Sequence, residues 1–305
     1  MPPTPIPMPQ ELVDHIVDTV ASLSSAGMHS ARIASERMRN MLSCTLVSRS
    51  FHYQARRHLF AHLQLVVGIF DTPWGPIAKS LLEALESDIE LAGRVRSLRF
   101  IVDSAGRDNC RPERQKMNQL YAARILPLLT GLQHLFVGYY SAEGQRVSGL
   151  VGFNQNLRSA IWNLHNHPHL TSFELGSDII VPGGFLDGWT NLKTLTIHPP
   201  SGIRLGVNGL YAPSHPIEPA CIETLVSKNF DQIQLALELG QLSANFLSQL
   251  RALYANLEEA SYQGESLYLL IANVSSTLQV LEMGNSIGAL LSSSHRITTQ
   301  LIIHE

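Results

Sequence analysis

The strongest metal-like pattern in the sequence is a run of alternating histidines, His165, His167 and His169. Alternate residues of an extended strand point to the same side, and imidazole nitrogens bind zinc or copper. However, Pro168 interrupts the run, and no carboxylate or thiolate stands beside it. We therefore interpret the segment as a solvated turn before a strand, and we predict no metal site.

Patterns typical of enzymes are weak in this chain. The glycine-rich stretch 183–188 lacks GxGxxG spacing and the lysine of a phosphate-binding loop, and no GxSxG elbow occurs. Cys44 has His52 eight residues further on, but a catalytic thiolate must be exposed and activated. Cys44 instead falls in an apolar helical pattern, which indicates a core side chain. We predict neither an enzyme nor a bound cofactor.

Arg94, Arg96 and Arg99 form a small basic cluster around one predicted strand. One interpretation is a solvated strand edge. The other is a patch for an acidic target. The sequence leaves both open.

The composition is that of a folded chain. With 45% hydrophobic and 15% charged residues, its 305 residues can bury either one large core or one small module plus a longer repeat array. The net charge of −3 gives no reason to expect nucleic acid or an anionic membrane as a partner. We predict no membrane-spanning helix and no signal peptide. Cys44, Cys110 and Cys221 form no CxxC pair, which favours a reducing compartment, either cytosol or nucleus.

Helices are expected first along the chain. An apolar stripe at four-residue steps predicts an amphipathic helix that begins near Pro9. The serine-rich residues 21–36 predict a flexible insertion, with the alternative that its end is already the start of the next helix, and a clear helical pattern resumes near Arg37. Ser48 or Ser50 is the expected N-cap of a third helix.

From residue 63 the apolar period changes to two, which indicates strands. A pattern of apolar, two residues, apolar, one residue, apolar then recurs. Its units are Val95/Leu98/Phe100, Leu132/Leu135/Val137, Leu170/Phe173/Leu175, Leu192/Leu195/Ile197, Ile222/Leu225/Ser227, Leu257/Ala260/Tyr262, Leu278/Leu281/Met283 and Thr298/Leu301/Ile303. Helical patterns lie between many of them, at 77–92, 113–129, 155–165 and 232–254. This alternation predicts a parallel sheet of stacked units with the helices on one side.

Both parts of the chain resemble known families. The recurring LxxLxL pattern is similar to leucine-rich repeats, in the irregular form seen in F-box proteins. Residues 8–16, MPQELVDHI, resemble the opening of an F-box, and residues 42–51, LSCTLVSRSF, resemble its second half. ARRHLF at 55–60 is similar to a segment common in fungal F-box-like proteins. The resemblance implies a small all-α three-helix F-box-like module at 1–62, then an α/β leucine-rich-repeat solenoid with a parallel sheet at 63–305.

The resemblance also implies a function. F-box proteins dock a Skp-family adaptor of cullin-RING ubiquitin ligases, and their repeats hold a protein target. The corresponding partner-binding residues here are Pro9, Leu12, Val13, Ile16, Leu42, Leu46, Val47 and Phe51. We therefore expect a non-enzymatic substrate-recognition adaptor of a Skp-cullin-F-box ligase, active in ubiquitin-dependent protein degradation. The alternative is a leucine-rich-repeat interaction scaffold with a degenerate F-box and no ligase role, since the insertion at 21–36 separates the halves of the motif.

Two expectations have open alternatives. Some docking residues, Leu46 and Phe51 above all, have a second interpretation in which they only hold the three helices together. The sequence also stops inside the strand-like residues 301–305 without a polar cap, which would leave an apolar edge. We expect either a C-terminal truncation or a partner that covers this end.

Overall fold

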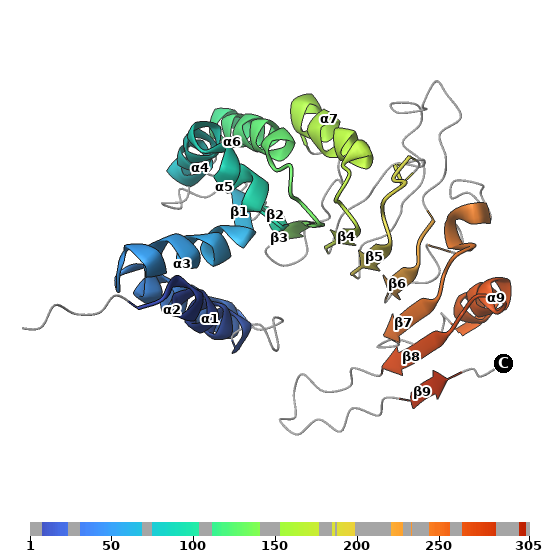
Figure 1. Ribbon diagram of the computed structural model, residues 1–305. Helices are drawn as coiled ribbons and strands as arrows, with labels where there is room; N and C mark the ends of the chain where they lie inside the picture. The colour runs from blue at the N-terminus through green and yellow to red at the C-terminus, as the bar shows by residue number, and fades with distance from the viewer. Residues whose placement is uncertain are drawn as a thin grey trace, which may run out of the picture.

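The computed structural model describes residues 8–23, 31–68, 75–103, 112–140, 153–176, 185–186, 188–198, 221–227, 233, 244–256, 264–284 and 299–302. Within these residues the chain forms three N-terminal helices, a nine-stranded sheet and helices that flank the sheet. Figure 1 shows the sheet following an arc, with the N-terminal helices at one end of it.

The first three helices are α1 (Gln10–Leu23), α2 (Ala31–Thr45) and α3 (Arg49–Ala61). Their facing apolar stripes enclose a small core made by Val13, Val17, Ala21, Met41 and Ala55. Ser48 caps α3, because its hydroxyl oxygen accepts a hydrogen bond from the Phe51 N–H. This confirms one of the two predicted caps. The three helices form a module with its own core, which we call the helical module.

The predicted insertion at 21–36 is wrong at its start, and at its end the structure agrees with the alternative in which it contains the start of the next helix. Helix α1 continues to Leu23, since Ala21 extends the buried stripe one turn beyond Val17. Helix α2 begins at Ala31, six residues before the predicted resumption near Arg37, in a stretch rich in alanine and arginine, which favour helix. Of the predicted insertion, only residues 24–30 lie outside the described residues.

The sheet begins directly after α3. Its strands are β1 (His62–Gly68), β2 (Ser97–Asp103), β3 (His134–Tyr140), β4 (Ser172–Leu175), β5 (Thr194–Ile197), β6 (Thr224–Ser227), β7 (Ala252–Asn256), β8 (Val280–Gly284) and β9 (Thr299–Ile302). Strand order in the sheet equals order in the chain, and β1 to β8 pair in parallel. The predicted parallel sheet is therefore confirmed.

The helices that flank the sheet lie on one side of it. They are α4 (Gly75–Ser87), α5 (Ile89–Arg94), α6 (Pro112–Ile125), α7 (Gln155–Asn163) and α9 (Gly264–Val274), with 3₁₀ turns η1 (Leu126–Leu128), η3 (Leu164–Asn166) and η4 (Ala244–Leu247). Figure 1 shows α4, α6, α7 and α9 outside the arc. We call the other side of the sheet the inner face. The helical pattern predicted at 77–92 is confirmed, and the structure divides it into two helices, because Asp88 caps α5 by accepting the Leu91 N–H.

The apolar positions of the recurring pattern build the core between sheet and helices. Its middle positions align across the strands and are at most 5% exposed, namely Leu98, Leu135, Phe173, Leu195, Leu225, Leu253 and Leu281. At this spacing, each unit buries its apolar side chains only against its neighbours. The intervening residues, such as Arg99 and Glu174, point to the inner face, because successive strand residues alternate.

The seventh strand lies earlier in the chain than predicted. Leu250, Leu253 and Ala255 are at most 3% exposed and occupy the repeat positions that the sequence pattern assigned to Leu257/Ala260/Tyr262, a unit outside the described residues. The helix predicted at 232–254 is therefore wrong over 244–254, where η4 and β7 form. Leu250 and Leu253 are three residues apart, a spacing that fits both a helix face and the first half of LxxLxL.

The last strand reverses direction. β9 pairs antiparallel with β8, with Leu301 opposite Leu281, so the parallel pairing expected for the final unit is wrong. A parallel connection needs a crossover, usually a helix, and the sequence predicted none between Met283 and Thr298.

Among the described helices, no helix is both long and apolar enough to span a bilayer.

Candidate functional site

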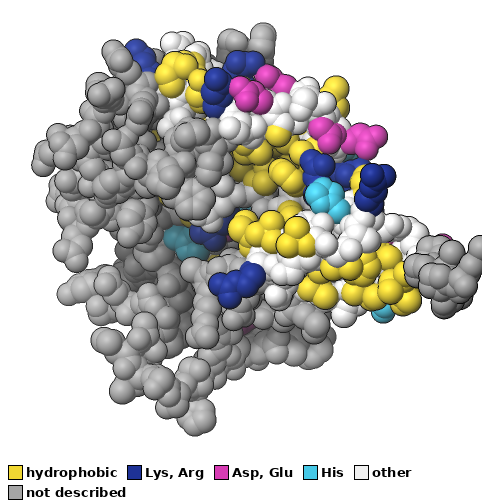
Figure 2. All heavy atoms as spheres, turned by 90° about the vertical axis from the view of Figure 1, so that its left-hand side faces the viewer, with side chains coloured by type: hydrophobic (Ala, Val, Ile, Leu, Met, Phe, Trp, Pro, Cys, Tyr) yellow, Lys and Arg dark blue, Asp and Glu magenta, His cyan; other side chains and the backbone are white. Residues whose placement is uncertain are grey.

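The C-terminal end of α2 carries an exposed apolar stripe. Met38 and Leu42 are 57% and 50% exposed, and in the turn that follows Leu46 and Val47 are 86% and 64% exposed. The turn is well formed, since the N–H groups of Leu46 and Val47 donate to the carbonyls of Ser43 and Cys44. We call these four residues the α2 stripe. Figure 2 shows groups of hydrophobic side chains on the face of the molecule that contains the helical module.

The structure divides the predicted partner-binding residues into two groups. Pro9, Leu12, Leu42, Leu46 and Val47 are exposed, whereas Ile16 and Phe51 are half-buried and Val13 is 2% exposed. Val13 belongs to the core of the helical module, and Phe51 packs against that core. Those side chains position the helices rather than face a partner. Met38 was not predicted, although it lies one helical turn before Leu42.

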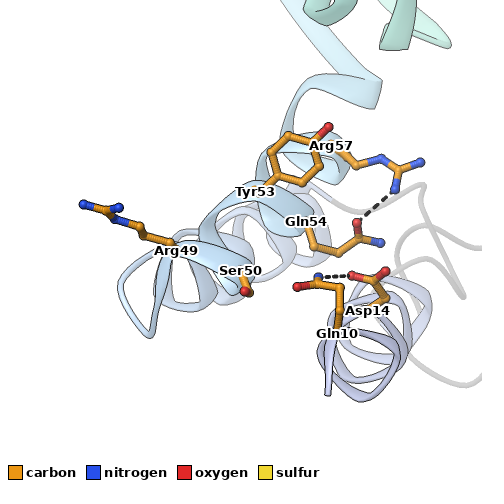
Figure 3. A pocket seen from close by; sticks show the side chains of 7 residues that line it. All are labelled: Gln10, Asp14, Arg49, Ser50, Tyr53, Gln54 and Arg57. Carbon is orange, nitrogen blue, oxygen red and sulfur yellow. Dashed lines mark hydrogen bonds between the residues drawn. The ribbon is translucent and has the colours of Figure 1, made fainter. Parts of the chain in front are cut away.

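A pocket of about 360 Å³ lies between α1 and α3, lined by Gln10, Asp14, Arg49, Ser50, Tyr53, Gln54 and Arg57. Figure 3 shows the Gln10 amide bonded to Asp14 and the Arg57 guanidinium bonded to Gln54. Leu12 stands two residues from both Gln10 and Asp14, so it lies on the opposite side of α1. The pocket and the exposed apolar residues are thus separate features of the helical module.

The three arginines predicted as one basic cluster have different surroundings. The Arg94 guanidinium donates to the Tyr53 hydroxyl at 2.6 Å and thereby ties α5 to α3. Arg96 donates to the Gly131 carbonyl at 3.1 Å. Arg99 lies over the ring of Phe136 on the inner face. Only Arg99 presents its charge on the inner face of the sheet.

A carboxylate held by two histidines also lies on the inner face. Glu174 on β4 accepts from His134 Nε2 at 3.2 Å and from His198 Nε2 at 2.6 Å. The Ser97 hydroxyl lies 3.2 Å from the other ring nitrogen of His134. Burial favours a higher pKa for Glu174, but the hydrogen bonds and charge of the two histidines outweigh it and lower the pKa to about 2. Sequence spacing gave no signal for this cluster, because its members come from different strands.

The alternating histidines do not converge. His165 lies in η3, and its Nδ1 donates to the Trp162 carbonyl at 2.7 Å. His167 Nε2 donates to the Leu129 carbonyl at 2.9 Å, and burial lowers the pKa of His167. The segment thus forms a 3₁₀ turn ahead of β4. Within the described ranges, no group of three His, Cys, Asp or Glu side chains is placed to hold a metal ion.

The other patterns considered for catalysis have structural roles where they are described. Cys44 is half-buried and packs against the core of the helical module, while His52 Nδ1 donates to the Thr45 carbonyl at 3.3 Å. In the glycine-rich stretch, Phe185 and Leu186 are buried in the sheet core. Gly188 follows with a φ of 82°, a conformation that favours glycine.

The fold and these surfaces define an α/β protein in which a helical module precedes a parallel sheet flanked by helices. Comparison of the chain with protein-family models and with curated protein sequences finds no match.

Proposed function

We propose that the protein is a substrate-recognition adaptor of a Skp-cullin-F-box ubiquitin ligase. In this proposal the helical module is an F-box that docks a Skp-family adaptor. The sheet with its outer helices is an irregular leucine-rich-repeat solenoid that holds a protein target. In this proposal the ligase acts in the cytosol or nucleus, because the three cysteines of the sequence form no CxxC pair and favour a reducing compartment.

The α2 stripe is the observation that carries the proposal. A folded domain that exposes several large apolar side chains together commonly uses them to bind a partner. Leu42, Leu46 and Val47 of the stripe belong to the segment that resembles the second half of an F-box. Leu12, 47% exposed on α1, belongs to the segment that resembles its opening. Exposure and resemblance therefore point to the same residues.

The energetics of the stripe fit a docking surface. Full burial of one exposed Leu or Val side chain contributes about 1.5–3 kcal/mol. The four stripe residues and Leu12 are between 47% and 86% exposed, so most of that contribution is unused in the free protein. Association itself costs several kcal/mol, and burial of these five side chains together would contribute toward offsetting that cost.

Co-expression with a Skp-family adaptor and co-purification test the proposal. The wild-type chain is expected to retain the adaptor, and Leu12→Asp combined with Leu46→Asp is expected to lose it. Both substitutions lie at exposed positions, so the module should stay folded. The matched control is Ile89→Asp combined with Tyr268→Asp, because these side chains are 79% and 70% exposed on α5 and α9.

Each outcome of this experiment is informative. Failure of the wild-type chain to bind the adaptor refutes the proposal. Equal binding by the Leu12/Leu46 variant and the wild type refutes the assignment of the surface. A folded chain that captures specific proteins, with no ligase subunit among them, would instead favour the scaffold with a degenerate F-box.

A further inference from the structure

The inner face carries a pre-oriented arginine. The Arg99 guanidinium carbon lies 4.3 Å from the centroid of the Phe136 ring, and the two residues are register partners on β2 and β3. Stacking on a ring restricts the plane of a guanidinium and leaves its edge N–H groups free to bind. Arg99 is itself exposed. Its donors are therefore arranged for a planar acceptor that arrives from solvent.

Two glycines leave the space that the Phe136 ring beneath Arg99 occupies. A Cβ atom at Gly138 would lie 2.5 Å from Phe136 Cε1, and one at Gly176 would lie 2.7 Å from Phe136 Cζ. Any larger residue at either position would displace the ring. Phe136 is only 8% exposed, and its ring meets the ring of His198 edge-on at 6.4 Å. We call Arg99, Phe136, Gly138 and Gly176 the arginine platform.

The carboxylate in the same register row does not neutralise the platform. Glu174 is the partner of Phe136 on β4, but His134 and His198 occupy both of its oxygens. In the part of the chain that the structure describes, no carboxylate forms an ion pair with Arg99. Among the described residues, the Arg99 guanidinium is therefore available to an anion that a partner supplies.

The residues beside the platform favour an extended polypeptide as that partner. Ser172, Thr194 and Thr224 align in register on the inner face, followed by Thr196 in the next row. Hydroxyl groups donate and accept, so they can bind both N–H and C=O groups of an extended backbone. A single stacked arginine matches one carboxylate in a bidentate arrangement.

We propose that the arginine platform binds an Asp or Glu side chain of an extended segment in the target protein. The inference rests on the proposed function in one respect, that the sheet holds a target. The platform is formed by residues of β2, β3 and the position after β4 and shares no residue with the α2 stripe, so docking of the adaptor and binding of the target can fail independently.

A displayed library of random 12-residue peptides, selected against the full-length wild-type chain, tests the proposal. Enriched peptides should share an Asp or Glu at one position. Fluorescence polarisation should then show Arg99→Ala weakening the selected peptide by about tenfold or more. Replacing the peptide acid by its amide should weaken binding to the wild type equally, and should have little further effect on Arg99→Ala.

Three controls make the test specific. Arg124→Ala removes an arginine from the outer helix α6, where it pairs with Glu86, and should leave peptide binding unchanged. Leu12→Asp with Leu46→Asp should also bind the peptide like the wild type, whereas Arg99→Ala should still dock the Skp-family adaptor. Phe136→Leu keeps an apolar side chain but removes the ring, and should weaken the peptide as Arg99→Ala does.

Several results would overturn the proposal. They are a selection without a shared acidic position, unchanged affinity in Arg99→Ala, or equal weakening by Arg124→Ala. Binding that becomes more than tenfold tighter when phosphoserine replaces the acid would overturn the choice of a carboxylate, because the site would then be built for phosphate.

Discussion

Glu174 is expected to stabilise the folded chain by an amount that decreases as the pH falls into the acid range. Replacing Glu174 by glutamine should remove this contribution. Glu174 is held by His134 and His198 on the inner face, and its pKa is lowered from 4.5 to about 2. Its side chain is 22% exposed, so solvent screens these contacts only in part. The carboxylate therefore stabilises the folded chain wherever it is ionised.

The sign and size follow from proton linkage. A carboxyl group with a lower pKa in the folded state stabilises the fold above its unfolded pKa, and this stabilisation is lost as the pH falls toward the folded pKa. For a pKa lowered from 4.5 to about 2, the contribution of Glu174 is about 3 kcal/mol at neutral pH and about 1 kcal/mol at pH 3.

Denaturant unfolding at pH 7, 4 and 3 measures this contribution. Tryptophan fluorescence reports on the relevant region, because Trp189 is 1% exposed and packs against Phe173 of β4 with ring centroids 4.8 Å apart. The difference in free energy of unfolding between wild type and Glu174→Gln should shrink by about 2 kcal/mol from pH 7 to pH 3. The control Glu83→Gln changes an exposed partner of Lys79 and should show no such trend. A difference for Glu174→Gln that is equal at all three pH values refutes the reasoning.

Three further substitutions test particular contacts. Gly131→Ala should lower the melting temperature strongly, because its Cβ would lie 2.1 Å from the Gly93 carbonyl oxygen, and an unchanged melting point would contradict this close approach. Ser48→Ala should cost about 1 kcal/mol by removing the cap on the Phe51 N–H, and chemical denaturation that shows no loss would contradict the cap. Leu253→Ala should cost about 2–5 kcal/mol in the same assay, since Leu253 is fully buried on β7; a loss under 1 kcal/mol would contradict the register of that strand.

The sheet was predictable because one physical requirement repeats along the sequence. Each strand must bury alternate residues against its neighbours, so Leu98, Leu135 and Leu195 recur with the same local spacing. Helix α7 was predictable for a similar reason, since Leu157 and Ile161 lie on one face and both are buried. Local spacing therefore carries most of the architecture of the sheet.

The wrong or missing predictions share one cause. A local sequence pattern does not show which distant residues its side chains will contact. Leu250 and Leu253 satisfy a helix stripe as well as a strand unit, and only pairing of β7 with β6 decides between them. The apolar spacing around Asp88 fits a helix interior, but the Asp88 carboxylate caps the start of helix α5. The Glu174 cluster was out of reach for the same reason, because its histidines come from neighbouring strands.

The candidate partner surface shows how much adjacent apolar residues can differ. Leu12 and Val13 are neighbours with similar hydrophobicity, but Leu12 is 47% exposed and Val13 is 2% exposed. A helix turns by about 100° per residue, so the position of the core decides which of the two faces solvent. The sequence therefore predicts the segments proposed to bind, and only packing shows which of their side chains are exposed and which belong to the core.

The same distinction between exposed and core side chains supports the role proposed for the α2 stripe. Leu46 and Val47 belong neither to the core of the helical module nor to the core of the sheet, so their side chains contribute little to folding. An apolar residue that stabilises nothing in the free chain still carries the risk of aggregation. A folding role therefore does not account for Leu46 and Val47, which supports our proposal that a partner covers them. Substitutions at Leu46 can thus report on docking without unfolding the module, and substitutions at Val13 cannot.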